Sequence, residues 1–409
     1  MHIAMVSEHA SPLAAPGGPD SGGQNVHVRE LSRALASAGH QVTVLTRRDD
    51  PAQPDAVAMR PGVTVRHVDA GPTRPIPKDD VVAHIPELAR GLEELWRAEP
   101  PDVVHAHFWM SGLAAAAAVR ELDIPLVQTF HALGCVKRRH QGTADTSPDG
   151  RIRAERLLTT LADRVVATCE DELFELVRMG APRGRVSIVP CGVDTAEFAP
   201  DGPAAPRGDR PRLVSVGRLV RRKGVDEVVA ALAAVPDAEL VIAGGPTATA
   251  EHGPAADDDI ARLRAVAARS GVADRVRFLG AVPRDQVTAV LRSADAVVCA
   301  PWYEPFGMVA LEAMACERAV VATAVGGMQD TVVHGVTGLH VPPRRPDALA
   351  AALRDLLTHP TRPAEFGAAG RARVLARYTW ERVAAATERV YGDVLDERVV
   401  PARAVGGRR

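Results

Sequence analysis

Residues 301–343 read PWYEPFGMVALEAMACERAVVATAVGGMQDTVVHGVTGLHVPP, and this stretch decides the fold. The apolar run at 296–300 that precedes it is typical of a buried parallel strand, and Pro301, Pro305 and Gly307 predict a loop. Residues 308–315 are rich in good helix formers. A strand, a loop and a helix in this order form the repeating unit of an α/β protein, whose ligands bind at the carboxyl ends of the strands.

Two carboxylates lie inside this unit, Glu304 in the loop and Glu312 on the helix. The backbone N–H groups near Gly307, Met308 and Val309 have no partner within a helix that starts there, so they suit a phosphate. We therefore interpret the stretch as a candidate nucleotide-sugar site. Paired carboxylates can also be acid–base catalysts, metal ligands or surface residues, and their spacing does not separate these alternatives.

The same alternation continues along the chain and predicts helices on both faces of mostly parallel sheets. We expect strands at residues 2–7, 41–46, 63–68, 102–105, 126–129, 164–168, 186–189, 213–217, 239–244, 275–280, 296–300 and 319–322. We expect helices at residues 24–38, 84–97, 112–120, 151–162, 171–179, 224–234, 260–269, 284–293, 308–315 and 371–395.

A chain of 409 residues is too long for one ordinary core, so two domains are expected. The Pro- and Gly-rich composition at its middle predicts the boundaries 1–198, a linker at 199–211, 212–375 and a C-terminal segment at 376–409. With 49 Lys and Arg against 51 Asp and Glu, no nucleic-acid partner is indicated. The five cysteines form no C-x-x-C pair, and neither a signal peptide nor a membrane span is recognisable, which favours a cytoplasmic protein.

Polar groups recur where the predicted strands of the first half end. Gly22 and Gly23 close a glycine-rich loop that begins at Gly17, and they would let a diphosphate or a sugar approach the backbone, unless they only make the turn. His131 follows the strand at 126–129 and is a stronger candidate than His107, although histidines at strand ends are usually structural.

Two basic segments are candidates for binding anions. The segment 136–149 is interpreted either as a solvated loop or as an acceptor loop that uses Lys137, Arg138 or Arg139. Arg218 and Lys223 follow the strand at 213–217 and could clamp a diphosphate, one by its forked geometry and one as a point charge. The alternative is a solvated basic turn.

Together these motifs resemble the retaining GT-B glycosyltransferases of family 4. The resemblance rests on Gly22-Gly23, on His131, on GRLVRRKG at 217–224 and on EPFGMVALE at 304–312, and it covers essentially the whole chain. It implies an α/β protein of the GT-B class, with two Rossmann-like doubly wound domains facing across a cleft. It also implies that the last helix crosses back to the N-terminal domain.

The resemblance implies specific roles. Arg218 and Lys223 would hold the donor diphosphate, Glu304 the hydroxyls of the transferred sugar, Glu312 the ribose, and His131 the sugar near its reacting carbon. The implied catalytic residues are thus His131, Glu304, Arg218 and Lys223, and the donor set is Gly22, Gly23, Arg218, Lys223, Glu304, Phe306, Gly307, Met308, Val309 and Glu312. The implied reaction is a front-face transfer with retention, without metal or cofactor, from a UDP- or GDP-linked hexose.

The acceptor is a small polar molecule by the same resemblance. DSGGQNVHV, HAHFWMSG and TFHALG are similar to the D-inositol-3-phosphate glycosyltransferases of mycothiol synthesis, whereas HALGCVK and YEPFG are similar to sucrose-phosphate synthases. Phe108 and Ala132 stand where the first group presents a tyrosine and a threonine to the acceptor phosphate, so two hydroxyl donors are missing. The implied acceptor set is Asn25, Lys78, Phe108, Ala132, Lys137, Arg138 and Arg153.

Two other functions are kept open at this point. One is a membrane-associated mannosyltransferase that acts on a lipid, and the other is a GT-B module that binds a nucleotide sugar without catalysis. Homodimer formation also stays open.

Overall fold

The computed structural model describes residues 1–14, 22–245 and 254–404, and of 254–257 and 399–404 the backbone alone. The predicted glycine-rich loop falls partly outside these ranges, at residues 17–21. The chain forms two compact units, Met1–Cys191 with Trp380–Arg409, and Gly192–Thr379. The chain thus passes between the units at 191–192 and again at 379–380, and the segment 199–211, expected as the linker, lies within the second unit.

The first unit is built on an eight-stranded sheet in the order β3-β4-β2-β1-β5-β6-β7-β8. All described neighbours pair in parallel except β3 and β4, which are antiparallel. The strands are β1 (His2–Val6), β2 (Gln41–Arg47), β3 (Ala56–Arg60), β4 (Val63–Val68), β5 (Val103–His107), β6 (Leu126–Thr129), β7 (Arg164–Ala167) and β8 (Val186–Ile188). Seven of them match an expected strand, and β3 was missed because a Pro- and Asp-rich segment leads into it.

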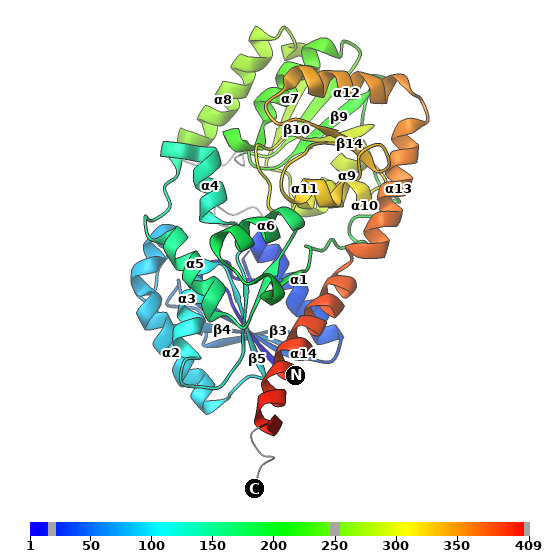
Figure 1. Cartoon of the computed structure of the whole chain (residues 1–409). Helices are drawn as coiled ribbons and strands as arrows, with labels where there is room; N and C mark the ends of the chain where they lie inside the picture. Colours follow the sequence, from blue (N-terminus) through cyan, green and yellow to red (C-terminus); the bar gives the residue numbers. More distant parts are fainter. Residues whose placement is uncertain (15–21, 246–253, 405–409) are drawn as a thin grey trace. The chain divides into compact units, whose positions relative to one another are not determined.

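Helices cover both faces of this sheet (Figure 1). They are α1 (Gly23–Ser37), α2 (Ile85–Ala98), α3 (Trp109–Ala118), α4 (Gly134–Gln141), α5 (Arg151–Leu161), α6 (Glu170–Met179) and α14 (Trp380–Ala404). Residues 78–84 form the 3₁₀-helix η1 (Lys78–His84). The last helix, α14, packs beside α1 in this unit, which agrees with the expected return of the chain.

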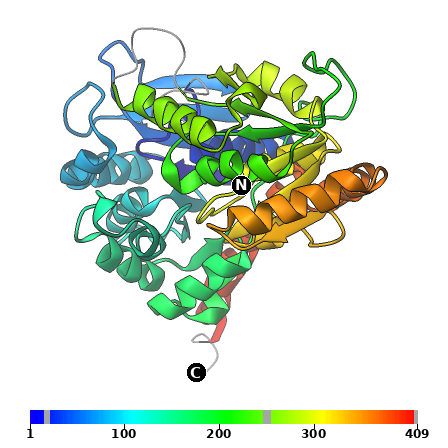
Figure 2. The same ribbon diagram turned by 90° about the horizontal axis from the view of Figure 1, so that it is seen from above.

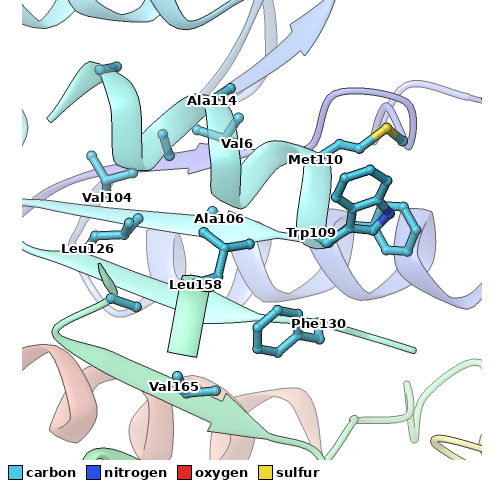
Figure 3. Packing of buried hydrophobic residues seen from close by; sticks show 14 of the residues in the cluster. Val6, Val104, Ala106, Trp109, Met110, Ala114, Leu126, Phe130, Leu158 and Val165 are labelled. Carbon is cyan, nitrogen blue, oxygen red and sulfur yellow. The ribbon is translucent and has the colours of Figure 1, made fainter. Parts of the chain in front are cut away.

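The core of the first unit forms where α3 and α5 pack on the sheet (Figure 3). Every residue of β5 is buried, as expected for a central strand that is covered on both faces. The labelled side chains in this cluster are Val6, Val104, Ala106, Trp109, Met110, Ala114, Leu126, Phe130, Leu158 and Val165.

The second unit is built on a six-stranded parallel sheet in the order β11-β10-β9-β12-β13-β14. Its strands are β9 (Arg212–Val216), β10 (Glu239–Ala243), β11 (Val276–Gly280), β12 (Ala296–Cys299), β13 (Ala319–Thr323) and β14 (Gly338–Val341). Its helices are α7 (Val225–Ala231), α8 (Pro254–Arg269), α9 (Arg284–Arg292), α10 (Met308–Ala315), α11 (Gly327–Thr331), α12 (Pro346–Thr358) and α13 (Arg362–Arg377).

Adjacent residues on these strands point into two different cores. Leu213 and Val298 pack with α7, α8 and α12, whereas Val214 and Val297 pack with α9, α10 and α13. Figure 2 shows α12, in orange, on the outside of this unit. Successive apolar residues of a strand are therefore buried on opposite faces of the sheet, as expected for an α/β fold with helices on both faces.

Three expectations about elements were wrong, and some elements were not expected. Residues 371–395 are not one helix, because Tyr378 leaves the helical path and its carbonyl accepts a hydrogen bond from the Val193 N–H at 2.8 Å. Residues 136–149 are not a loop throughout, because α4 reaches Gln141. The helix α8 begins at Pro254 rather than Ile260, and α12 and β14 were not expected. No helix in the described ranges is both long and apolar enough to cross a membrane.

Candidate active site

In the second unit, the predicted donor residues gather at the point where the strand order reverses. Strands β9 and β12 are neighbours, and the chain continues from β9 to β10 on one side and from β12 to β13 on the other. The carboxyl ends of two such strands border a natural ligand site, because the following loops diverge there. Arg218 and Lys223 lie on the loop after β9, and Glu304 lies on the loop after β12.

The loop after β9 is pressed against the end of β12. Gly224 has a φ of +66°, and a Cβ atom there would lie 1.9 Å from the Ala300 carbonyl oxygen, so only glycine fits. The Trp302 N–H donates to the Arg222 carbonyl at 2.8 Å, and the Trp302 indole N–H donates to Glu227 at 3.0 Å. These contacts fix Lys223 relative to the loop that carries Glu304.

Lys223 and Glu304 form an ion pair in which Lys223 Nζ donates to Glu304 Oε2. The Glu304 side chain is 11% exposed and that of Lys223 is 24% exposed. Burial alone would raise the pKa of Glu304, but the Lys223 charge and hydrogen bond, the Arg222 charge and a backbone hydrogen bond from Gly307 hold it below its ordinary value. Glu304 is thus an anion held in place beside a cation, with the side chain of Arg218 exposed nearby in sequence.

The Gly326-Gly327 turn supports the Glu304 loop from the other side. The Gly327 N–H donates to the Glu304 carbonyl at 2.9 Å, and a Cβ atom on Gly326 would lie 2.2 Å from that carbonyl oxygen. A Cβ atom on Gly327 would lie 2.6 Å from the Pro305 carbonyl oxygen. The two glycines therefore let two backbone segments meet, which no other residue would allow.

The start of α10 lies directly after this loop. Gly307 is the residue before the helix, with a φ of +78°, and Met308 and Val309 are its first two residues. Gly307 hydrogen-bonds to the Glu304 carboxylate, so its N–H already has an anionic partner. The Phe306 carbonyl accepts a hydrogen bond from Thr331 at 3.5 Å. The start of α10 is thus held next to the Glu304 loop.

Glu312 lies on the buried face of α10, four residues after Met308. Its carboxylate is 3.5 Å from Arg284 Nη1, and the same guanidinium is 3.0 Å from Glu197 Oε1. Burial raises the pKa of Glu312 to about 7, against the opposing effect of the Arg284 charge. The pKa of Glu312 therefore lies near neutral pH. The charge of Arg284 opposes this increase in pKa, and no motif in the sequence pointed to Arg284.

In the first unit, the strand order reverses between β1 and β5, and the histidine candidates lie at this edge. His131 follows β6 with a φ of +62°, and its Nε2 is 2.9 Å from His107 Nδ1. The ring of His27, on α1, is 5.0 Å from the ring of His131. Burial, together with neighbouring histidines, lowers the pKa of both His107 and His131 well below the ordinary value, so both rings are neutral at physiological pH.

Phe108 is the common neighbour of two cations in this unit. Lys78 Nζ and the Arg151 guanidinium each lie over its ring, 5.0 Å from the centroid. Burial and the Arg151 charge lower the pKa of Lys78. Arg151 also donates to the Ala132 carbonyl at 2.6 Å and to Glu155 at 2.7 Å. Lys78, Phe108 and Ala132 from the expected acceptor set therefore converge, and Arg151 joins them.

The other expected acceptor residues have different surroundings. Arg153 is exposed on α5, whereas Arg151, two residues earlier, is buried on another face of the helix. Lys137 pairs with Asp145 at 3.0 Å, and Arg138 lies 3.7 Å from Asp149. Both basic side chains lie on α4 and have acidic neighbours, as does Arg151, whose pair with Glu155 is almost fully buried.

Asn25 and the glycine pair shape the entrance to α1. The Asn25 side chain accepts from the Gly22 N–H at 3.1 Å and donates to the Ser11 carbonyl at 3.1 Å. Asn25 is buried. Gly23 begins the helix, and among the residues described a Cβ atom on Gly22 would meet nothing within 4 Å.

Three further residues were missed by sequence reasoning. Glu8 and His9 follow β1 directly, the same position relative to a strand that singled out His107 and His131. The Tyr391 hydroxyl, on α14, is hydrogen-bonded to Nδ1 of the buried His105 at 2.7 Å. Among the residues that the structure describes, no three His, Cys, Asp or Glu side chains are grouped as metal ligands.

Two parallel-sheet α/β units, each with its polar residues at a switch point, define the class of GT-B glycosyltransferases. Residues 21–197 match the family described as Glycosyltransferase Family 4, and residues 202–373 match the family described as Glycosyl transferases group 1. The chain belongs to the family 4 glycosyltransferases, and it is a glycosyltransferase with the GT-B fold.

Relatives and solved structures agree with this assignment. The chain is 38% identical to the D-inositol 3-phosphate glycosyltransferase of Xylanimonas cellulosilytica, over 98% of each chain. It is 36% identical to D-inositol 3-phosphate glycosyltransferase 2 of Catenulispora acidiphila, over 97% of this chain and 95% of the relative. The structure of a sucrose-phosphate synthase from Thermosynechococcus elongatus superposes with a TM-score of 0.87 at 32% identity, covering 97% and 99% of the two chains.

Proposed function

We propose that this glycosyltransferase moves a hexose, with retention, from a nucleotide sugar to a small phosphorylated polyol such as an inositol phosphate or a sugar phosphate. The buried Lys223–Glu304 pair at the β9/β12 switch point carries the proposal. A UDP sugar is the first donor to test, and a GDP sugar is the second.

The donor roles follow from the charges at this edge. Glu304 can accept hydrogen bonds from sugar hydroxyls because it stays ionised, whereas Lys223 and Arg218 can balance the diphosphate. Negative charge develops on the diphosphate as the sugar–phosphate bond breaks, so cations that are already in place lower the barrier. Glu312 would accept from the ribose hydroxyls in its ionised form.

Retention follows if the acceptor attacks on the face from which the diphosphate leaves. In that scheme the leaving phosphate takes the proton of the attacking hydroxyl, and the enzyme supplies position and charge rather than a protein nucleophile. His131, which is neutral in the free protein, is the candidate of the first unit for contact with the sugar.

The acceptor class rests on Lys78 in the first unit, which shares the Phe108 ring with Arg151, itself ion-paired to Glu155. Across the described residues, Lys78 makes no ion pair within 4.0 Å, so its charge is available to an acceptor phosphate. The relatives at 38% and 36% identity are named for an inositol phosphate, and the sucrose-phosphate synthase is named for a sugar phosphate. Phe108 and Ala132 supply no hydroxyl, so cations have to provide most of the phosphate recognition.

A donor screen followed by product analysis tests this proposal. UDP, GDP and ADP sugars are first ranked by thermal shift, and the best is then incubated with inositol phosphate, a hexose phosphate and their unphosphorylated forms. We expect mass spectrometry to show hexose on a phosphorylated acceptor. We also expect Glu304→Ala and Lys223→Ala to lose most turnover while remaining folded by circular dichroism. Near-normal turnover in either variant would overturn the donor assignment, and nucleotide binding without any transfer would favour a non-catalytic module.

A further inference from the structure

His107 is a buried histidine that the roles proposed above do not use. It is the last residue of β5, and it pairs with Thr129 on β6, whose carbonyl accepts a hydrogen bond from the Phe108 N–H at 2.8 Å. His131 follows two residues after Thr129, so the pairing of the two strands brings the histidines together. Their side chains meet with His107 Nδ1 at 2.9 Å from His131 Nε2.

The ring of His107 belongs to a short stack of imidazoles. Its centroid lies 4.2 Å from that of His105, with the planes 33° apart, and 5.1 Å from that of His131, with the planes 24° apart. His105 is itself fixed by hydrogen bonds to Tyr391 at 2.7 Å and to Thr129 at 2.8 Å. The stack leaves His107 little freedom to turn, so its hydrogen bond to His131 has a defined geometry.

One of the two facing nitrogens must carry the proton of this hydrogen bond. Both imidazoles are neutral, because burial lowers the pKa of each well below the ordinary value. A neutral imidazole has one N–H donor and one acceptor nitrogen. Either His107 donates from Nδ1 or His131 donates from Nε2.

The second nitrogen of His107 distinguishes these two arrangements. His107 is fully buried, and among the described residues no hydrogen-bond partner reaches its Nε2. If His131 were the donor, this Nε2 would carry a buried N–H group without a partner, and such groups are rarer in proteins than under-satisfied acceptors. If His107 donates from Nδ1, its Nε2 holds only a lone pair. The arrangement with His107 as the donor is therefore favoured.

The choice also decides which nitrogen of His131 carries a proton. When His131 Nε2 accepts from His107, the one proton of its neutral ring is on Nδ1. The backbone of His131 has a φ of +62°, a conformation that costs free energy in any residue with a side chain and persists only where the surroundings hold it. The hydrogen bond from His107 is one contact that holds His131 there.

We propose that His107 is the positioning residue of His131, and that it donates its Nδ1 proton to His131 Nε2 so that His131 meets the transferred sugar through Nδ1, as a hydrogen-bond donor and not as a base. The inference rests on the proposed function, in which His131 contacts the sugar. A donor in this place fits a transfer in which the leaving phosphate, and not the protein, takes the proton of the acceptor.

The first experiment determines the tautomer of His131 in the protein without substrates. ¹⁵N NMR spectra of histidine-labelled wild type are recorded near neutral pH, and the His131 signals are assigned by their loss in His131→Gln. We expect a protonated Nδ1 and a bare Nε2 for His131, and a bare Nε2 for His107. A protonated Nε2 on His131 would overturn the proposal.

The second experiment compares His107→Leu with His107→Asn. The asparagine amide can place an N–H group where His107 Nδ1 lies, whereas leucine fills a similar volume without a donor. We expect His107→Leu to lower kcat/KM for the nucleotide sugar about tenfold and His107→Asn to recover most of this loss. The Kd of the free nucleoside diphosphate, which lacks the sugar, and the KM of the phosphorylated acceptor should stay as in wild type.

The matched control is His67→Leu. His67 is a buried histidine of β4, a strand that pairs with neither β5 nor β6, and its Nδ1 lies 2.7 Å from the Pro54 carbonyl. The change thus removes an imidazole and its hydrogen bond from the same unit. It should lower stability, as His107→Leu does, and leave kcat/KM and the NMR signals of His131 unchanged.

The outcomes separate this proposal from the proposed function. If wild type transfers no hexose to any phosphorylated polyol, the proposed function fails, whereas the tautomer of His131 is still decided by the NMR spectra of the free protein. If wild type transfers hexose, but His107→Asn is as impaired as His107→Leu while both are folded by circular dichroism, the donor role of His107 is refuted. The NMR result on wild type applies even if His107→Leu does not fold.

Discussion

Replacing Lys223 by alanine should destabilise the second unit in a way that depends on pH. The change leaves the Glu304 carboxylate, 11% exposed, without its cation. Breaking a buried ion pair on one side costs about 3 kcal/mol or more, because the remaining charge has lost its compensation. With Lys223 at 24% exposure we take the lower end and expect a loss of about 3 kcal/mol at neutral pH.

The sign of the pH dependence distinguishes this cause from a general packing defect. In wild type the pKa of Glu304 is lowered, so its stabilising contribution is present above the ordinary carboxyl pKa and is lost as pH falls through the lowered value. In Lys223→Ala, burial dominates and raises the pKa of Glu304. Protonation then relieves the unpaired charge at mildly acidic pH, and the difference from wild type should shrink as pH falls towards about 5.

Urea unfolding at several pH values measures this difference, and hydrogen exchange in β12 and α10 locates it in the second unit. The control is the double variant Lys223→Met with Glu304→Gln, which removes both charges and should lie within about 1 kcal/mol of wild type. The reasoning is refuted if Lys223→Ala is as stable as wild type at neutral pH. It is also refuted if the double variant is as unstable as the sum of the two single changes.

Three further predictions concern the site and its support. Because the pKa of Glu312 is raised to about 7, the second unit should lose stability as pH rises from about 4.5 to about 7, and Glu312→Gln should abolish that slope in pH-dependent urea unfolding. Gly224→Ala should lower turnover, and it should lower the free energy of unfolding by about 1–3 kcal/mol. The control for the backbone angle alone is Gly180→Ala, because Gly180 has a φ of +106° and nothing within 4 Å of an added Cβ atom. Equal effects of the two changes would contradict the role of the Ala300 contact. Tyr391→Phe should cost about 1–3 kcal/mol because it removes the 2.7 Å partner of the buried His105, and an unchanged thermal unfolding temperature would show that this bond is not stabilising.

Elements whose limits are set by local residues could be predicted well from the sequence. The strand β6 and the helix α10 have the expected limits, since apolar or helix-forming runs are bounded there by breakers such as Gly307 and Pro125. The expected parallel α/β architecture is confirmed for the same reason, because both strand and helix periods recur throughout.

Elements that depend on distant partners could not be predicted. The helix α4 starts where the Gly134 N–H is bonded by both oxygens of Glu155, at 3.0 and 2.9 Å, and Glu155 is twenty-one residues away. The break before α14 depends on Tyr378, whose carbonyl pairs with Val193 and whose hydroxyl donates to the Asp330 carbonyl at 3.0 Å. The hydrophobic periodicity around Gly134 and Tyr378 gives no indication of these distant partners.

The candidate site shows the same division. Arg218, Glu304 and His131 could be singled out because they lie on loops that follow parallel strands, where such sheets bind ligands. The position of Arg151 beside Phe108 could not be predicted, because two residues of offset from Arg153 turn a helical side chain to another face. His9 was missed because nothing in the local sequence indicates that the Phe108 ring lies against it.

The most direct test of the central claim is the ratio of kcat/KM for a phosphorylated polyol to that for its unphosphorylated form, measured with one nucleotide sugar in wild type and in Lys78→Met. A charge-assisted contact to a phosphate is worth about 1.5–3 kcal/mol, so the ratio should exceed about tenfold in wild type and fall towards one in the variant. Equal transfer to both forms by wild type would contradict a phosphorylated acceptor bound at Lys78.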